Sequence, residues 1–183
     1  LDAYVTDFLS RAREMGHQVP DNAFKSAIDN LRNRVNYATD PNAASADENA
    51  ALAYAVAVLA RERAATIGDL RYYADTAPEA FKTPMSAGHI GAALAAFGDQ
   101  PPADAMFRRA YELAMQAPPE TRVWRSDYGT YMRDKVALLS LASDAGSTAI
   151  DLNRLTLDVA EQLAQQQERR IYRSTQELVW SVL

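Results

Sequence analysis

Apolar side chains recur along most of this sequence at the three- and four-residue spacings of amphipathic helices, and this periodicity restricts the fold more than any other feature. Two clear apolar stripes are Leu1, Tyr4, Val5, Phe8, Leu9 and Ala12, and Phe24, Ile28, Leu31 and Val35. No run reads as a strand, because valine and isoleucine are scattered singly among helix-favouring residues. The sequence therefore predicts an all-α protein.

Capping and breaking residues divide the periodic stretches into separate helices. Gly16 can end the first helix, because glycine accepts the positive φ of a C-terminal cap. Ser45 and Glu48 have the Ser-x-x-Glu spacing of a capping box, and Ser174 and Glu177 repeat it near the end of the chain. The predicted helices cover about residues 1–15, 21–39, 46–65, 68–76, 86–97, 101–117, 131–142, 152–163 and 175 onward.

The sequence also contains a weak internal repeat. The segment Ala3–Arg11 aligns with Ala53–Arg61 with Ala, Tyr, Leu and Arg in matching places, and similar small-apolar helices follow near Leu94 and Leu138. Such spacing is typical of stacked helix pairs, so we predict an α/α toroid of alternating inner and outer helices in one domain, residues 1–183. Because the pattern begins at Leu1 without a cap and stops inside an apolar run, we expect an incomplete toroid, excerpted from a larger multidomain chain.

Composition excludes several classes of function. The net charge of −5 and the dispersed Lys and Arg residues argue against nucleic-acid binding, and no apolar stretch is long enough to span a membrane. The chain has no Cys, which removes disulfides, thiolate metal sites and thiol nucleophiles. None of the common catalytic or phosphate-binding motifs occurs, so we expect no enzymatic activity and no cofactor.

The two histidines are too far apart in sequence to indicate a metal site. His17 follows Gly16 in a turn, and we interpret it as a solvated loop residue. His89 lies near the start of an Ala-rich helix, where a capping or packing role is the better interpretation and a functional role the alternative.

Aromatic and charged residues are densest in the segment 123–134. The interpretation we prefer is structural: Asp127 caps the following helix, Trp124 and Tyr131 fill the core, and Arg133 and Asp134 lie on the rim. The functional interpretation is a contact edge consisting of Trp124, Asp127, Tyr128, Tyr131 and Arg133.

Three segments of the chain, residues 4–20, 124–134 and 173–177, resemble the thioester domain of the bacterial α2-macroglobulins, and together they extend over nearly the whole sequence. The resemblance implies a toroid inside a multidomain protease trap, in which bait cleavage exposes an internal Cys-Gln thioester that acylates the attacking protease. Its implied partners are target proteases and neighbouring β-domains, and its implied location is the periplasm or cell envelope, with a lipid anchor on the parent protein. Because the chain lacks Cys, the Cys-x-Glu-Gln motif cannot lie within it. The resemblance places that motif upstream, so we expect a non-catalytic scaffold portion from the C-terminal part of the thioester domain.

Two alternatives from other classes stay open on the sequence. An α/α-toroid enzyme, such as a glycosidase or a cyclase, would need acids clustered at one rim of the inner helices. Its acids would be Asp2, Asp7, Asp127 and Asp134. A helical-repeat module for protein binding would instead present a concave groove.

Overall fold

The computed structural model describes residues 1–116, 125, 127, 129–168 and 174–182, and within these residues it contains helices and no strand. The elements are α1 (Asp2–Glu14), α2 (Asp21–Asn36), α3 (Ala46–Arg61), α4 (Ile67–Asp75), the short 3-10 helix η1 (Pro78–Ala80), α5 (Pro84–Ala96), α6 (Gln100–Gln116), α7 (Tyr131–Asp144), α8 (Leu152–Glu168) and α9 (Thr175–Trp180). The all-α prediction is confirmed.

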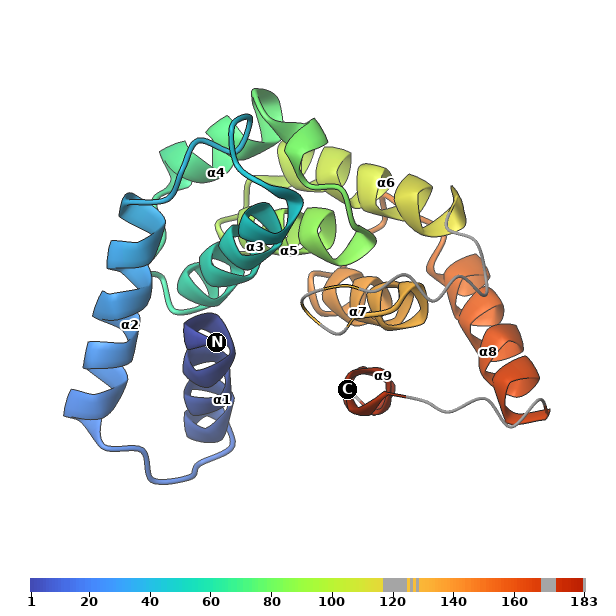
Figure 1. The fold of residues 1–183 in the computed structure, drawn as a ribbon, viewed down its shortest axis with the longest axis horizontal. Helices are drawn as coiled ribbons and strands as arrows, with labels where there is room; N and C mark the ends of the chain where they lie inside the picture. Colours follow the sequence, from blue (N-terminus) through green and yellow to red (C-terminus); the bar gives the residue numbers. More distant parts are fainter. Residues whose placement is uncertain (117–124, 126, 128, 169–173, 183) are drawn as a thin grey trace.

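The helices form two layers that alternate along the chain. The inner layer follows the order α1, α3, α5, α7 and α9, because each of these helices packs on the next one in the series. The even-numbered helices lie outside this arc, and each contacts at least one inner helix (Figure 1). This arrangement is that of an α/α toroid, as predicted.

The main core is centred on α5, which is buried on nearly every side. Its small residues allow close approach: a Cβ added at Gly91 would lie 3.2 Å from the Phe107 ring on α6, and one at Gly88 would lie 3.3 Å from Leu138 on α7. Phe107 and Leu138 are both fully buried. The Ala- and Gly-rich sequence of α5 thus lets α6 and α7 pack closely against it.

The boundaries of several helices differ from the predictions, and two of the differences have a clear local cause. Helix α3 ends at Arg61 rather than near Ala65, because Arg63 adopts a positive φ of 56° that reverses the chain. Helix α5 begins at Pro84 rather than Ser86, because Thr83 and Ser86 form a capping box. The two capping boxes predicted from the sequence, at α3 and α9, are both present.

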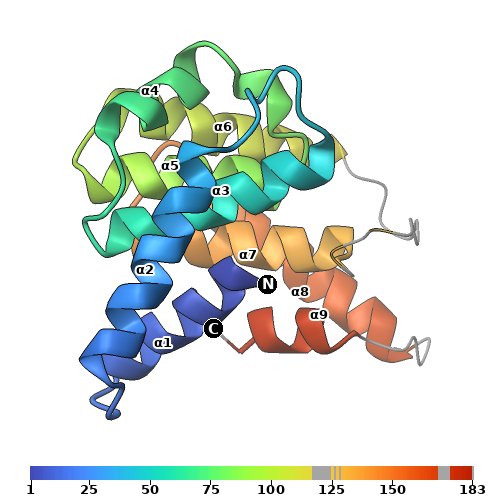
Figure 2. The ribbon, with the colours of Figure 1, turned by 60° about the vertical axis from the view of Figure 1, so that its left-hand side comes forward.

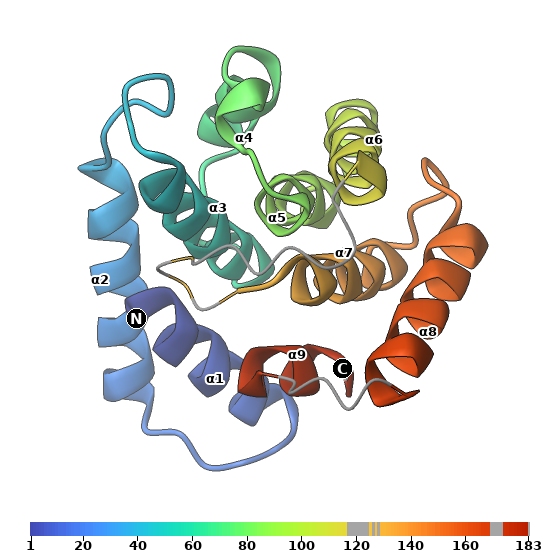
Figure 3. The same ribbon diagram turned by 45° about the vertical axis from the view of Figure 1, so that its right-hand side comes forward.

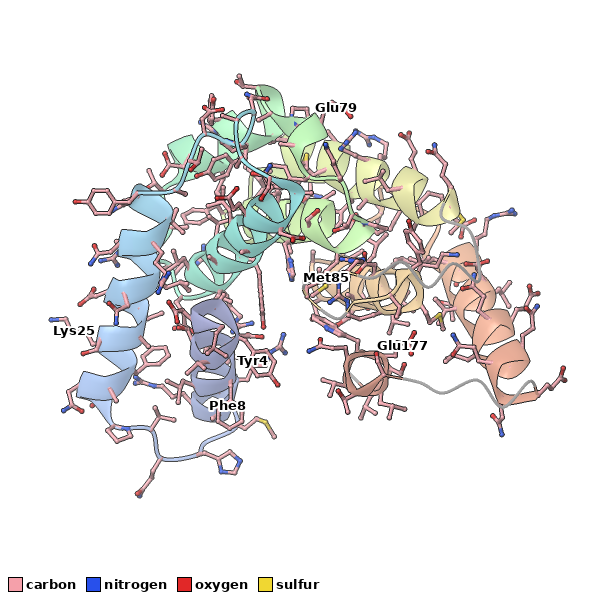
Figure 4. The ribbon with its side chains drawn as sticks, in the orientation of Figure 1. Tyr4, Phe8, Lys25, Glu79, Met85 and Glu177 are labelled. Carbon is pink, nitrogen blue, oxygen red and sulfur yellow. The ribbon has the colours of Figure 1, made fainter. Side chains whose placement is uncertain are left out.

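Helices α1 and α9 are the first and last members of the inner layer, and each has a neighbouring inner helix on one side only. Figures 2 and 3 show both helices on the same side of the molecule. Their large apolar side chains are exposed: Leu1, Tyr4, Val5 and Phe8 on α1, and Leu178, Val179 and Val182 on and after α9. Figure 4 shows Tyr4 and Phe8 directed away from α2. We call the surfaces that these residues form the open faces of α1 and α9.

Candidate functional site

Four charged side chains gather at the N-terminal end of α7, inside the segment that the sequence singled out. Arg133 Nη2 lies 2.6 Å from Asp134 Oδ1 and 2.8 Å from Asp127 Oδ2. Arg125 bridges the same two carboxylates, at 2.8 Å each. We call Arg125, Asp127, Arg133 and Asp134 the α7 charge cluster; its two positive and two negative charges balance.

The structure corrects two predictions about this segment. Arg133 and Asp134 do not lie on the rim, because only 4% and 0% of these residues is exposed. Helix α7 has neighbours on many sides (α5, α6, α8 and α9), so its first turn is inside the molecule. The α7 N-cap is Thr130, whose hydroxyl accepts from the Arg133 backbone N–H, because a cap must directly precede the first helical residue.

Asp127 belongs to the charge cluster instead of capping α7. Burial by itself would raise the pKa of this carboxyl, but the hydrogen bond and charge of Arg133, the Gly129 backbone N–H and Arg125 together hold the pKa below its ordinary value. Gly129 N–H donates to Asp127 Oδ1 at 2.9 Å. The preceding loop is thereby tied to the first turn of α7.

The five residues of the predicted contact edge differ in how far they are exposed. Arg133 is buried and its guanidinium is bonded to carboxylates, whereas Asp127 and Tyr131 are half-buried. Trp124 and Tyr128 lie outside the described residues. A contact edge at this segment stays a prediction, and within the described part only Asp127 and Tyr131 have surface to offer it.

A second polar contact links α7 to α9. Thr130 Oγ1 donates to Glu177 Oε1 at 2.5 Å, while Glu177 Oε2 accepts from the Ser174 backbone N–H at 2.9 Å. Figure 4 shows Glu177 between the two helices. One carboxylate therefore both caps α9 and attaches it to α7, and the buried Trp180 follows one turn later.

We expect Glu177→Ala to release α9 selectively. The substitution removes the cap and the bond to Thr130 together, which should destabilise this helix by about 1–2 kcal/mol. Amide hydrogen exchange should accelerate at residues 175–180 and stay unchanged in α3 and α5. Glu48→Ala is the matched control, because Glu48 occupies the same capping-box position in α3 without such a second contact. Equal, purely local effects of the two substitutions would contradict a linking role for Glu177.

A second buried ion-pair network joins α1 to α3. Asp7 is buried and accepts from Arg61 Nη2 at 2.5 Å and from the Tyr54 hydroxyl at 2.7 Å. Arg11 Nε adds a third donor at 3.1 Å. Burial would raise the pKa of Asp7, but these partners, Arg61 first, hold it below the ordinary value. Asp7 and Arg11 have the i,i+4 spacing of a solvated surface pair on a helix, but α3 covers Asp7 and buries it.

His89 packs beside this network. Its ring stacks on Tyr54 with centroids 4.9 Å apart and an angle of 10° between the planes. Burial disfavours the charged imidazolium and lowers the pKa of His89 to about 3. The packing role predicted for His89 is confirmed, and His17 is exposed as expected.

The acids that an enzyme would need are all occupied by arginine. Asp7 and Asp127 have lowered pKa values, whereas a catalytic carboxylate pair needs one acid with a raised pKa. Asp2 pairs with Arg34, and Asp134 with Arg133 and Arg125. Within the described ranges, no three His, Asp or Glu side chains are grouped so that they could hold a metal ion.

Comparison with known proteins relates this chain to one family. The chain is 34% identical to the α2-macroglobulin of Escherichia coli strain K12 over 155 residues, which cover 79% of the chain and 9% of that protein. This chain belongs to the bacterial α2-macroglobulins. No protein-family profile matches it.

Solved α2-macroglobulins contain the same fold. The crystal structure of Salmonella α2-macroglobulin reacted with methylamine matches 96% of the chain and 11% of its own length, with a TM-score of 0.78 and 30% identity. The trypsin-activated E. coli α2-macroglobulin matches 96% of the chain and 12% of its own length, with a TM-score of 0.73 and 30% identity. The chain thus spans only about a tenth of the length of these α2-macroglobulins.

The internal repeat points to part of the site that motif reading missed. Arg11 and Arg61 occupy matching positions in the two aligned segments of this α2-macroglobulin homologue, and both bind Asp7. Consecutive inner helices thus present the same residue type to a common centre.

Among the described helices, none is long and apolar enough to cross a membrane.

Proposed function

We propose that this chain is a non-catalytic scaffold portion of an α2-macroglobulin that inhibits endopeptidases by trapping them. The match of 96% of the chain to a trypsin-activated α2-macroglobulin carries this proposal. The structure supports it physically, because the acids that a hydrolase would use are bound to arginines. The chain lacks Cys, so the thioester that captures the protease would lie in another part of the protein.

We propose further that residues 1–183 are part of a larger helical domain. The open faces of α1 and α9 would then pack against further helices of the same toroid, which bury exposed apolar surface and complete the inner layer. The outer surface would contact neighbouring β-domains of the same protein. The proposed location is the periplasm or cell envelope, with a lipid anchor on the parent protein.

The substitution Phe8→Glu tests whether the open face of α1 is exposed or covered by further helices in the longer protein. Phe8 is 66% exposed, so in the 183-residue chain the substitution should change the free energy of unfolding by less than about 0.5 kcal/mol. In the longer protein a buried Phe8 would make the same substitution destabilising by roughly 2–4 kcal/mol. Thermal or urea unfolding of both forms provides the comparison.

Tyr37→Glu is the control for this pair of measurements, because Tyr37 is 90% exposed at the end of the outer helix α2. It should be neutral in both forms. If Phe8→Glu is also neutral in the longer protein, α1 is not covered there and the larger toroid is excluded.

The trapping function is tested on the longer protein by titrating free thiols before and after methylamine. A thioester opens to release one thiol per chain, and pretreated protein should then fail to retain trypsin covalently. Release without covalent trypsin capture would contradict the protease-trap proposal. If no thiol is released, the covalent route is excluded, and non-covalent retention of trypsin would have to be measured by gel filtration.

A further inference from the structure

A cavity of about 330 Å³ lies where the five inner helices α1, α3, α5, α7 and α9 converge. Figure 3 shows these helices around a common centre. One wall is polar and contains Arg11, Arg61 and His89. The rest of the lining is largely apolar and includes Ala92, Leu141 and Trp180, together with the exposed carboxylate of Asp144.

The polar wall places two arginines beside one buried carboxylate. Arg11 and Arg61 share a single buried carboxylate, that of Asp7, whose oxygens also accept from the Tyr54 hydroxyl. Glu14 lies 3.5 Å from Arg61, but it is more than half exposed, so solvent screens its charge. Asp144, which also lines the cavity, is exposed as well, so Arg11 and Arg61 have one buried carboxylate and two solvent-exposed ones nearby.

The same wall has hydrogen-bond donors that are unused within the described part of the chain. Arg11 contacts Asp7 through Nε alone, which leaves its two terminal Nη groups. Arg61 uses Nε and Nη2, which leaves Nη1. Both side chains line the cavity, so these groups can reach a ligand inside it.

His89 adds a hydrogen-bonding group to the same wall. It is 3% exposed and lines the cavity, yet among the described residues its ring nitrogens have no hydrogen-bond partner. The His89 nitrogens are not among the fully buried polar atoms that lack a hydrogen bond in the described residues, so they keep contact with the open cavity. A buried imidazole beside two underused guanidinium groups is complementary to an acceptor that carries negative charge.

We propose that this cavity binds a carboxylate with an apolar body. The free Nη groups of Arg11 and Arg61 and the ring N–H of His89 donate to its oxygens, while Leu141 and Trp180 contact its hydrocarbon part. This site is additional to the scaffold role. The carboxylate can belong to a small acid or to a polypeptide, as a glutamate side chain or a chain end.

The test is an NMR titration of the chain with phenylpropionate, using phenylpropionamide and phenylpropylamine as neutral and cationic analogues. The imidazole C–H signals of the two histidines report separately. Phenylpropionate should shift the His89 signals saturably, while the exposed His17 does not respond. No saturable shift, or equal binding of the amide or the amine, would overturn the proposal.

Two substitutions localise the binding. Arg11→Gln should weaken the affinity for phenylpropionate roughly tenfold or more, because hydrogen bonds to charged groups are lost. Arg13→Gln, on the same helix and paired with Asp21 instead, should leave it unchanged. If Arg11→Gln does not fold, Arg11→Lys keeps a charge beside Asp7 and removes the spare Nη donors, so it should weaken binding as well. Unchanged affinity in the Arg11 variant would place the ligand elsewhere.

Peptides identify the source of the carboxylate. One peptide ends in phenylalanine with a free carboxylate, its partner is amidated, and a third carries an internal glutamate. Binding of the first alone indicates a chain end, and binding of the third indicates a glutamate side chain. Binding of neither, with phenylpropionate still bound, indicates a small acid.

Discussion

Replacing Asp134 with alanine should lower the free energy of unfolding by about 3 kcal/mol, since it breaks a buried and balanced ion-pair cluster. Asp134 is fully buried and bonds to both Arg133 and Arg125. Without it, two guanidinium groups share the Asp127 carboxylate, and one buried positive charge is left without compensation. Urea unfolding near neutral pH, followed by circular dichroism, measures the loss.

Two comparisons identify the charge as the cause. Asp29→Ala breaks an exposed pair with Arg32 on α2 and should change stability by less than about 0.5 kcal/mol. Asp134→Asn keeps the shape of the side chain, removes its charge and replaces one acceptor oxygen by an amide donor, so it should lose most of what Asp134→Ala loses. If the Asn variant is as stable as the natural chain, packing rather than charge explains the effect and the cluster is not electrostatically important.

The helices could be predicted from the sequence because their signals are local. Apolar periodicity and the capping residues Ser45 and Ser174 act within one or two turns, and the structure confirms them. The predictions from sequence fail where contacts with neighbouring helices, rather than local signals, determine whether a residue is buried. Helix α7 begins with Arg133 and Asp134 inside the molecule because α5, α6, α8 and α9 surround it, which no feature of its own sequence indicates.

The polar networks could not be predicted from local sequence, because their partners are far apart in the chain. Asp7 meets Tyr54 and Arg61 across two helices, and Thr130 meets Glu177 across α8. The spacing of Asp7 and Arg11 predicts their ion pair correctly, yet it says nothing of the α3 residues that bury Asp7. Of the sequence features, only the internal repeat relates Arg11 to Arg61. It does so because matching positions of consecutive inner helices face the same centre.

These networks have one physical consequence in common. Most inner helices of this toroid are joined by apolar contacts, but α1 is also joined to α3 through Asp7, and α9 to α7 through Glu177. Ion pairs and hydrogen bonds fix the register of two helices more narrowly than apolar surfaces do. The ends of the arc, where packing partners are fewest, are thus the places where directional bonds hold the helices in position.

His89 should make the chain sensitive to mild acid. Its pKa is about 3 in the folded chain because of burial, whereas the unfolded chain binds the proton near the ordinary value of 6.5. The stabilisation is therefore fully present above about pH 6.5 and is lost as the pH falls toward the folded pKa. Between about pH 6 and pH 4 the free energy of unfolding should fall by about 1.4 kcal/mol per pH unit.

His89→Phe should abolish most of this slope, because phenylalanine retains a ring that can stack on Tyr54 and has no proton to bind. His17→Phe, at an exposed turn, should leave the slope intact, which makes the two variants a matched pair. Asp7 and Asp127 have lowered pKa values, so their contributions begin to be lost only below about pH 5, and the slope between about pH 6 and pH 5 reports mainly His89. Urea unfolding at several pH values measures each slope, and a steep slope that survives in His89→Phe would show that other groups cause the acid sensitivity.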